Sequence, residues 1–413
     1  MSVFDELVGQ PAAVEALKAA AAAARRIRAN AATGTNATGA SDAAVGSGVG
    51  NETDASNSAM SQAWLFTGPP GSGRSIAART LAAALECTGP EPGCGECSAC
   101  TAVMDDNHPD VDSISTEGVT ITVAQTRDLV ARSHLAPGAP WRVFIIEDAD
   151  RMAERTTNVL LKAIEEPGPR TVWMLCTPSP ADVLTTIRSR CRNVALVTPG
   201  AEDVAGLIMA RDGVNHDVAL LAAQAAQSHV GMARALATDV RMRTRRSDSL
   251  KLAASIRGVG DAVIAAQRLF DTAKASADEQ SEERNAQERE ELLRDLGVDD
   301  AARIPPSVRS QIKDLEDQQK RRGTRALRDV LDRELVDMLS LYRDVLVRQL
   351  GADVALVNSD FSDDVARLAS AATVEQTIAR MDALAKARER IDANVTPLLA
   401  LEAAMVALRP LAP

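Results

Sequence analysis

Aromatic side chains are rare in this sequence, which has 413 residues but contains three Trp, one Tyr and five Phe. Proteins that bind single-stranded nucleic acid commonly stack the bases on aromatic rings. So few rings argue against base stacking as a main binding device. The core must instead be built from Ala, Leu, Val and Ile, which favours helices and a sheet of branched residues.

Positive charge is also in the minority, with 46 Lys and Arg against 57 Asp and Glu and a net charge of −11. A protein that coats DNA neutralises phosphates with clustered Lys and Arg. The charge balance therefore argues against independent DNA binding. It leaves open membership of a larger assembly that handles DNA.

Signals for export and for membrane insertion are missing as well. The first residues, Met1 to Asp5, contain no basic leader before an apolar run, so a secretory signal is not expected. The sequence has no uncharged apolar stretch of about 18 residues, the length of a membrane span. We expect a cytoplasmic protein with no membrane partner.

One stretch, Asn30 to Asn57, has no Lys or Arg and consists mainly of Ala, Gly, Ser, Thr and Asn. It cannot bury enough apolar area to offset the entropy of ordering, so we expect residues 30–57 to be a disordered insertion. The Ala-rich segment before it, from Pro11 to Arg28, has helical spacing, with Pro11 in the first turn.

Apolar runs alternate with helical patterns between residues 63 and 196. Val143–Ile146 and Val172–Cys176 are short and continuous, as in parallel strands that helices cover on both faces. From residue 197 onward, Ala, Leu and Val recur at helical spacing. The segment Asp278–Arg325 is dense in charge, which indicates a solvated helical arm or a partly disordered insertion.

A phosphate-binding loop is the clearest motif. It follows the strand-like run Ala63–Thr67 and precedes the helical pattern Ser75–Glu86. Its residues are Gly68, Pro69, Pro70, Gly71, Ser72, Gly73, Arg74 and Ser75. They match G-x-x-x-x-G-K-[ST] except that Arg74 replaces the lysine. Glycines let backbone N–H groups surround phosphates at a helix N-terminus, and the Ser75 hydroxyl suits Mg²⁺, so the pattern indicates an ancestral ATP site.

Two departures weaken this site. Lysine is a compact point charge, whereas Arg74 carries a wider planar fork. The apolar run Val143–Ile146 ends in Glu147 and Asp148, the reverse of the usual Asp-Glu order. This exchange moves both carboxylates by about one methylene, and catalysis is sensitive to displacement on that scale. We expect hydrolysis to be impaired, with a working ATPase as the alternative.

Four of the six cysteines are clustered, at Cys87, Cys94, Cys97 and Cys100. Two overlapping C-x₂-C steps with a fourth Cys nearby can complete a tetrahedral Cys₄ site for Zn²⁺. Four thiolates leave no open position, so such a zinc is structural. Disulfides or an iron–sulfur cluster are the alternatives, and clustering in a cytosolic chain favours metal ligation.

The order of these motifs resembles that of bacterial clamp-loader subunits of the AAA+ class, most closely the delta-prime type of DNA polymerase III. The resemblance is carried by the string Val8–Gln10, the phosphate loop, the cysteine insertion and two later motifs. One is the N-x-x-L-K-x-x-E-E-P segment Asn158–Pro167, and the other is the S-R-C triplet Ser189–Cys191. The resemblance is strong over about residues 1–240 and only architectural beyond.

The resemblance implies roles for individual residues. Arg190 of the triplet matches the arginine finger, which reaches the ATP of a neighbouring subunit and stabilises transition-state charge there. Thr177 matches the polar sensor beside the γ-phosphate, and Arg234 in Gly231–Arg234 matches the second sensor on the lid helix. The backbone of Val8 and Gly9 would lie near the adenine.

The fold class that the resemblance implies is an α/β AAA+ domain with a parallel sheet, followed by a small helical lid and an all-α collar. The expected parts are the AAA+ domain at 1–196, with the insertion at 30–57 and the zinc module at 87–100, the lid at 197–246, and the collar at 247–413, with the charged insertion at 278–325.

A degraded site in cis and an intact arginine in trans are typical of the delta-prime type. We therefore expect a subunit of a hetero-oligomeric clamp loader, which belongs by membership to a polymerase (nucleotidyltransferase) holoenzyme and places the sliding clamp on primed DNA. The alternatives are an active gamma/tau-type motor subunit, a scaffold that binds no nucleotide, and an independent DNA-binding zinc protein.

Overall fold

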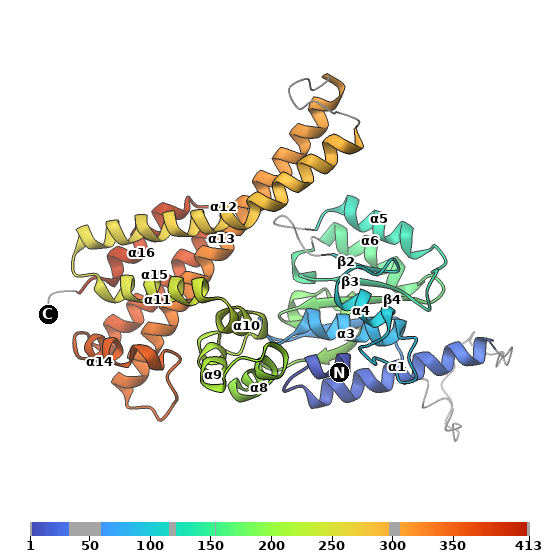
Figure 1. Ribbon diagram of the computed structural model, residues 1–413, viewed down its shortest axis with the longest axis horizontal. Helices are drawn as coiled ribbons and strands as arrows, with labels where there is room; N and C mark the ends of the chain where they lie inside the picture. The colour runs from blue at the N-terminus through green and yellow to red at the C-terminus, as the bar shows by residue number, and fades with distance from the viewer. Residues whose placement is uncertain (1, 33–58, 115–120, 153, 297–305, 411–413) are drawn as a thin grey trace. The chain divides into compact units, whose positions relative to one another are not determined.

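The computed structural model describes residues 2–32, 59–114, 121–152, 154–296 and 306–410. The chain divides into two compact units, Met1–Arg234 and Ala235–Pro413 (Figure 1). Each unit encloses a hydrophobic core of its own. In the described part of the chain, no helix combines the length and the apolar character that crossing a membrane requires.

A sheet of five parallel strands forms the centre of the N-terminal unit. Its strands are β1 (Ala63–Thr67), β2 (Val111–Ile114), β3 (Arg142–Ile146), β4 (Thr171–Thr177) and β5 (Arg192–Ala195). They lie in the order β2-β3-β4-β1-β5, and every neighbouring pair is parallel. The parallel sheet predicted from the apolar runs is confirmed.

Helices cover this sheet on both faces (Figure 1). Trp64 and Phe66 of β1 enter the core formed with α1 (Pro11–Ala32) and α3 (Arg74–Glu86). Leu65 enters the core on the other face, with α5 (Val123–Ser133) and α6 (Glu154–Glu165). Neighbouring strand residues point to opposite faces, so a continuous apolar run is what a sheet buried on both sides requires.

Short elements complete this unit. They are η1 (Val3–Glu6), α4 (Ser98–Met104), η2 (Ala149–Arg151), η3 (Pro180–Asp182), α7 (Thr185–Arg188), α8 (Ala201–Asp212) and α9 (His216–Ala225), and α10 (Val230–Thr238) spans the boundary between the units. Helix α8 packs against α9, and small side chains such as Ala205, Ala219 and Ala223 are fully buried there.

The described part of the C-terminal unit contains helices and no strand. Its elements are α11 (Val240–Ser255), α12 (Val259–Asp295), α13 (Pro306–Leu350), η4 (Ser359–Phe361), α14 (Ser362–Ser370), α15 (Val374–Asp392) and α16 (Pro397–Leu408). Leu335, Tyr342, Leu384 and Leu401 are fully buried in its core. The helical spacing of the second half of the sequence therefore predicted the correct element type.

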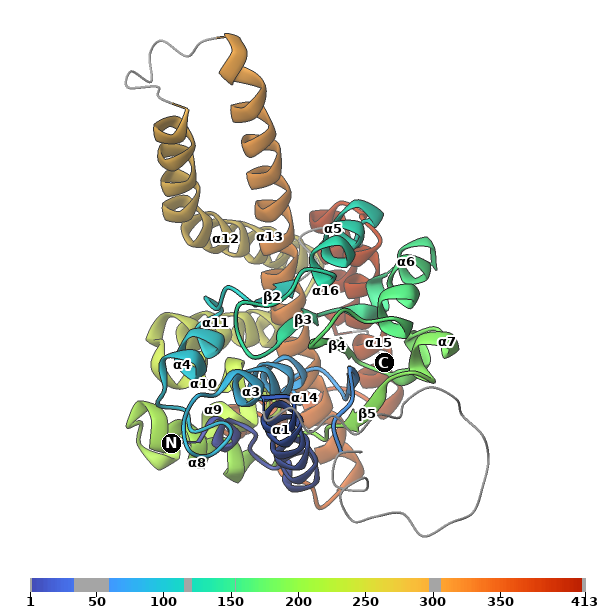
Figure 2. The same cartoon turned by 90° about the vertical axis from the view of Figure 1, so that its right-hand side faces the viewer.

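The charged segment 278–325 forms a helical arm in its described residues. The end of α12 and the beginning of α13 run side by side and extend beyond the other helices of this unit (Figure 2). Arg322 of α13 donates to Glu288 of α12 at 2.8 Å, and Gln319 donates to the Asn285 carbonyl at 3.0 Å. The hydrogen bond from Arg322 lowers the pKa of Glu288 to about 2. Polar contacts thus connect the two helices of the arm, whereas residues 297–305 lie outside the described part.

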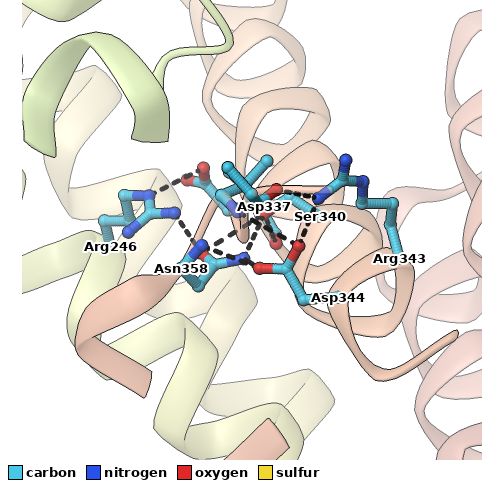
Figure 3. Close-up of polar contacts among 8 residues, drawn as sticks. Arg246, Asp337, Ser340, Arg343, Asp344 and Asn358 are labelled. Atoms are coloured by element: carbon cyan, nitrogen blue, oxygen red, sulfur yellow. Dashed lines mark hydrogen bonds and ion pairs between the residues drawn. The ribbon is translucent and has the colours of Figure 1, made fainter. Parts of the chain in front are cut away.

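A buried polar network fixes the segment after α13 to α13 and α11 (Figure 3). Asp344, fully buried, accepts hydrogen bonds from the backbone and side chain of Asn358 at 2.7 and 2.8 Å. Arg246 of α11 donates both to Asn358 and to Asp337 of α13. Arg343 donates to Asp344 at 2.7 Å. Each carboxylate in the network is paired, as buried charge requires.

One predicted boundary was wrong. Helix α1 continues to Ala32, past the predicted end at Arg28, so residues 30–32 of the expected disordered insertion are helical. Alanine is the best helix former, and Ala29, Ala31 and Ala32 extend the pattern without a stop signal. Residues 33–57 of the expected insertion lie outside the described residues. The separation of residues 197–246 as a lid and 247–413 as a collar stays a prediction.

Candidate nucleotide pocket and metal centre

The phosphate loop leads from the end of β1 into α3. Gly71 and Gly73 have φ of 85° and 88°, a region that other residues rarely adopt. Gly73 is also the N-cap of α3, where the first backbone N–H groups have no intrahelical acceptor. The loop, Gly68 to Ser75, therefore places free N–H groups where an anion can bind.

Arg74 is the first residue of α3, and its Nη1 donates a hydrogen bond to the carbonyl oxygen of Gly68 at the start of the loop. Ser75 is half-buried in the same first turn. The Ser72 hydroxyl is buried and has no hydrogen-bond partner in the described part of the chain. Buried hydroxyls nearly always have a partner, and a phosphate oxygen would supply one. The loop therefore fits a nucleotide.

The acidic pair after β3 is partly engaged by a cation. Glu147 Oε1 lies 3.4 Å from Nη2 of Arg79, one turn after Ser75 on α3, and the same Nη2 lies 3.7 Å from Asp106 Oδ2. Asp148 is the N-cap of η2 and has a φ of 54°. Oxygen atoms of Ser75, Glu147 and Asp148 are of the type that Mg²⁺ prefers, and their role as ligands stays a prediction.

Thr177 lies beside the beginning of the phosphate loop. It is the last residue of β4 and pairs in register with Thr67, the last residue of β1. Its hydroxyl is buried and donates to the Ser179 carbonyl at 3.1 Å. The register therefore brings Thr177 to the edge where the loop starts, and its role as a sensor stays a prediction.

The Cys176 thiol lies within the electrostatic influence of charged side chains from the loop, from α3 and from the segment after β3. Burial raises the pKa of the Cys176 thiol, and the charges of Glu147, Arg74, Asp148 and Arg79 also act on it. Cys176 is buried at the end of β4. Glu147 and Asp148 add to this shift, whereas Arg74 and Arg79 oppose it.

A cavity of about 520 Å³ lies beside the loop. Its lining includes Val8, Gln10, Gly73, Ile76 and Arg234. A volume of this size is typical of small-molecule sites, which span roughly 300–1,000 Å³. The cavity thus brings together Val8 and Gln10 of the N-terminal string, Ser72 and Gly73 of the loop, and Arg234. The other predicted nucleotide-binding residues are outside its described lining.

Gln10 holds the N-terminal string against the loop. Its amide is buried, donates to the carbonyls of Val197 at 2.5 Å and Ser72 at 3.3 Å, and accepts from Val197 N–H at 3.1 Å. Gly9, with a φ of 69°, lies against Pro199. The string Val8–Gln10 therefore connects the phosphate loop with the residues that follow β5.

Arg234 lines the cavity, but its guanidinium is bound by Asp212. Nε donates to both oxygens of Asp212 at 2.9 and 2.8 Å, and Nη2 donates to Oδ1 at 2.7 Å. The hydrogen bonds from Arg234 lower the pKa of Asp212. Arg234 is thus held at the end of α8 beside the cavity, and its sensor role stays a prediction.

Arg190 lies in the turn between α7 and β5 and is outside the cavity lining. Its side chain is 42% exposed and forms an ion pair with Glu165 at 2.6 Å. Nη1 donates to the Thr186 carbonyl at 2.8 Å. An exposed guanidinium that takes no part in its own cavity is available to another molecule.

The four clustered cysteines form a candidate metal centre. Their sulfur atoms all lie within 4.8 Å of one another, with 3.6 Å from Cys87 to Cys94 and 3.9 Å from Cys87 to Cys97. A tetrahedral site with Zn–S bonds of about 2.3 Å requires sulfur separations of about 3.8 Å. Backbone N–H groups of Glu96 and Cys97 lower the pKa of the Cys94 thiol. The spacing fits four thiolates around one ion, and all four cysteines are free of disulfides.

The sequence did not predict the contacts that three residues make near the phosphate loop. Gln10 and Arg79 act through partners that are distant in sequence. His229 lies so close to the loop that a Cβ on Gly71 would stand 2.9 Å from its Cα. No local spacing signals such contacts, because they depend on how the segments fold together.

Comparison with known proteins agrees with this geometry. Residues 51–199 match the family model described as DNA polymerase III, delta subunit. A DNA polymerase III subunit delta' of Pseudomonas aeruginosa is 38% identical over 144 residues, which cover 34% of this chain and 44% of that protein. The subunit delta' of Bacillus subtilis is 33% identical over 166 residues, which cover 40% and 50%.

A relative of another subunit type also matches. The DNA polymerase III subunit gamma/tau of Mycobacterium tuberculosis is 36% identical over 135 residues, which cover 32% of this chain and 23% of that protein. The chain spans half or less of the length of these curated relatives. Residues 51–199 are thus similar to the DNA polymerase III delta-subunit family, and the predicted resemblance to delta-prime-type clamp-loader subunits is confirmed.

Proposed function

We propose that this chain is a delta-prime-type subunit of a DNA polymerase III clamp loader, and that it supplies Arg190 to the ATP site of a neighbouring subunit. The observation that carries this proposal is the exposed guanidinium of Arg190, which lies outside its own chain's cavity. An arginine finger contributes to catalysis by stabilising charge on a transferring phosphate. Such a group must be accessible to another molecule.

The chain's own pocket binds nucleotide and turns it over poorly. Arg74 takes the place of the lysine and is hydrogen-bonded to the Gly68 carbonyl. Glu147 is paired with Arg79. The phosphate groups would be held by the backbone N–H groups of Gly71 and Gly73 and by the Ser72 hydroxyl, while Mg²⁺ would supply charge neutralisation.

The remaining parts serve assembly. Residues 1–196 form the AAA+ domain, 197–246 the lid, and 247–413 the collar that joins the hetero-oligomeric ring. Zinc on the four cysteines stabilises the module at 87–100. The ring loads the sliding clamp onto primed DNA, and this chain contacts both through the complex.

The decisive test is Arg190→Ala in a loader reconstituted with its motor subunits. Loss of an arginine finger lowers turnover at the affected site by about 10³-fold or more. The ATPase rate of the loader should therefore fall by the fraction that this site contributes to the total rate. Arg188→Ala is the matched control, since Arg188 is two residues away and its side chain donates to the Pro180 carbonyl at 3.2 Å. Unchanged ATPase with Arg190→Ala would falsify the assignment.

The similarity to gamma/tau supports a second candidate, an active motor subunit. The ATPase rate of the purified chain separates the two functions. Turnover that is abolished by Ser75→Ala would favour the motor. Absence of binding to a fluorescent ATP analogue would favour a scaffold without nucleotide.

A further inference from the structure

The arginine proposed to act in trans is held within this chain by a carboxylate. Arg190 Nη2 lies 2.6 Å from Glu165 Oε1, and Arg190 Nη1 donates to the Thr186 carbonyl. Glu165 is the last residue of α6, and Arg190 follows α7. The N-x-x-L-K-x-x-E-E-P segment, through Glu165, and the S-R-C triplet, through Arg190, therefore meet in one ion pair.

The surroundings of this pair make it specific but weak. The C-terminal end of α6 carries the negative end of a helix dipole, which adds to the attraction of Glu165 for a cation. The side chains of Arg190 and Glu165 are 42% and 43% exposed, so water and salt screen the pair. The pair is strong enough to favour one orientation of Arg190 and weak enough to be exchanged for a stronger anion.

We propose that Glu165 is a positioning residue that holds Arg190 in a resting orientation until nucleotide phosphates on a neighbouring subunit replace its carboxylate. This inference rests on the proposed function of Arg190. A nucleoside triphosphate carries more negative charge than one carboxylate and also offers oxygen pairs that match a guanidinium. Glu165 therefore competes with the nucleotide for Arg190. This competition raises the ATP concentration at which Arg190 binds the nucleotide in the neighbouring subunit's site.

The test is Glu165→Gln in the reconstituted loader, with ATPase measured over a range of ATP concentrations. Removing the competing charge should lower the ATP concentration for half-maximal turnover by about 1.5- to 5-fold, the range expected for an exposed pair. The plateau rate should stay within twofold, because Arg190 engages the same phosphates once the site is complete. In an Arg190→Ala background, Glu165→Gln should produce no shift.

Glu166→Gln is the matched control. Glu166 is the next residue and is also exposed. Because Glu166→Gln removes the same charge, a general charge effect would lower the ATP concentration for half-maximal turnover equally in both variants. Equal shifts, a Glu165→Gln curve that coincides with the parent, or a lower plateau rate would each overturn the inference. Its failure is distinct from failure of the proposed function, in which Arg190→Ala itself leaves ATPase unchanged.

Discussion

A carboxyl group lies without a partner in the C-terminal unit. Glu334 of α13 is 3% exposed, and neither of its oxygens has a hydrogen-bond partner in the described ranges. Burial raises the pKa of Glu334 to about 8, with Arg245 opposing the shift and Asp337 adding to it. The group therefore keeps its proton at neutral pH, since ionisation would place an unpaired charge in the interior.

Replacing Glu334 by Gln should stabilise this unit in a pH-dependent way. The folded-state pKa is raised from 4.5 to about 8, so the folded chain holds a proton that the unfolded chain releases, and stability falls as pH rises through this window. We expect Glu334→Gln to match the parent near pH 5 and to exceed it by about 2–4 kcal/mol at pH 8.

Urea unfolding at both pH values measures this difference. Glu389→Gln is a suitable control because Glu389 is exposed on α15 of the same unit. An equal difference between variant and parent at the two pH values would show that Glu334 is ionised in the folded protein.

Local motifs predicted much of the site at the scale of residues. The phosphate loop and the four cysteines are recognisable because their chemistry depends on short spacings. The structure brings the four sulfur atoms together and places Ser72 and Gly73 of the loop at the cavity. The partners of Arg74, Arg190 and Arg234 were not predictable. Asp212 is distant in sequence from Arg234, and Glu165 is distant from Arg190, so their pairing depends on the tertiary fold.

At the scale of elements, hydrogen bonds attach the cysteine module to α1 and to η1, the first two helical segments of the chain. Arg25 of α1 donates to the carbonyls of Gly89 at 2.5 Å and Cys87 at 3.4 Å. Val3 N–H donates to the Gly93 carbonyl at 3.0 Å. Because the module has few apolar residues of its own, a bound ion is expected to hold these carbonyls in place.

We expect the purified chain to contain one equivalent of zinc. Cys94→Ser should lose the metal and lower the stability of the N-terminal unit by an amount on the order of several kcal/mol, since binding energy at a structural site contributes directly to folding. Elemental analysis and thermal unfolding give the two readings. Cys191→Ser is the control, because Cys191 lies outside the cluster. Full metal content in Cys94→Ser would refute a four-thiolate site.

Element types were predictable where periodicity was strong, and boundaries were less so. The apolar runs gave β3 and β4 to within one residue at each end. The end of α1 was missed because the residues after Arg28 (Ala29, Asn30, Ala31 and Ala32) have the same composition as the low-complexity stretch that follows them. The charged segment 278–325 left two alternatives open, since an arm stabilised by polar contacts has a composition close to that of a disordered chain.

At the scale of the whole molecule, the two units differ in how their apolar cores are built. The N-terminal unit is built on a sheet whose two faces carry separate apolar clusters. The C-terminal unit is built on helices around Leu335 and Tyr342. Units that each bury a core of their own can unfold as separate cooperative blocks.

Calorimetry should therefore resolve two transitions in the full chain. Metal chelation should lower the temperature of one, and Glu334→Gln at pH 8 should raise the temperature of the other. A single transition that both treatments shift together would mean that the units unfold as one block.

The buried network around Asn358 determines which helix positions meet in the C-terminal unit (Figure 3). Apolar side chains tolerate sliding by one turn, because one leucine can replace another in a contact. A slip of α13 by one turn would separate Asp337 from Arg246 and Asp344 from Asn358. The buried charges would then lack partners, and each would lower the free energy of unfolding by several kcal/mol. The network thus selects one axial register of α13 among several whose hydrophobic contacts would be nearly equivalent.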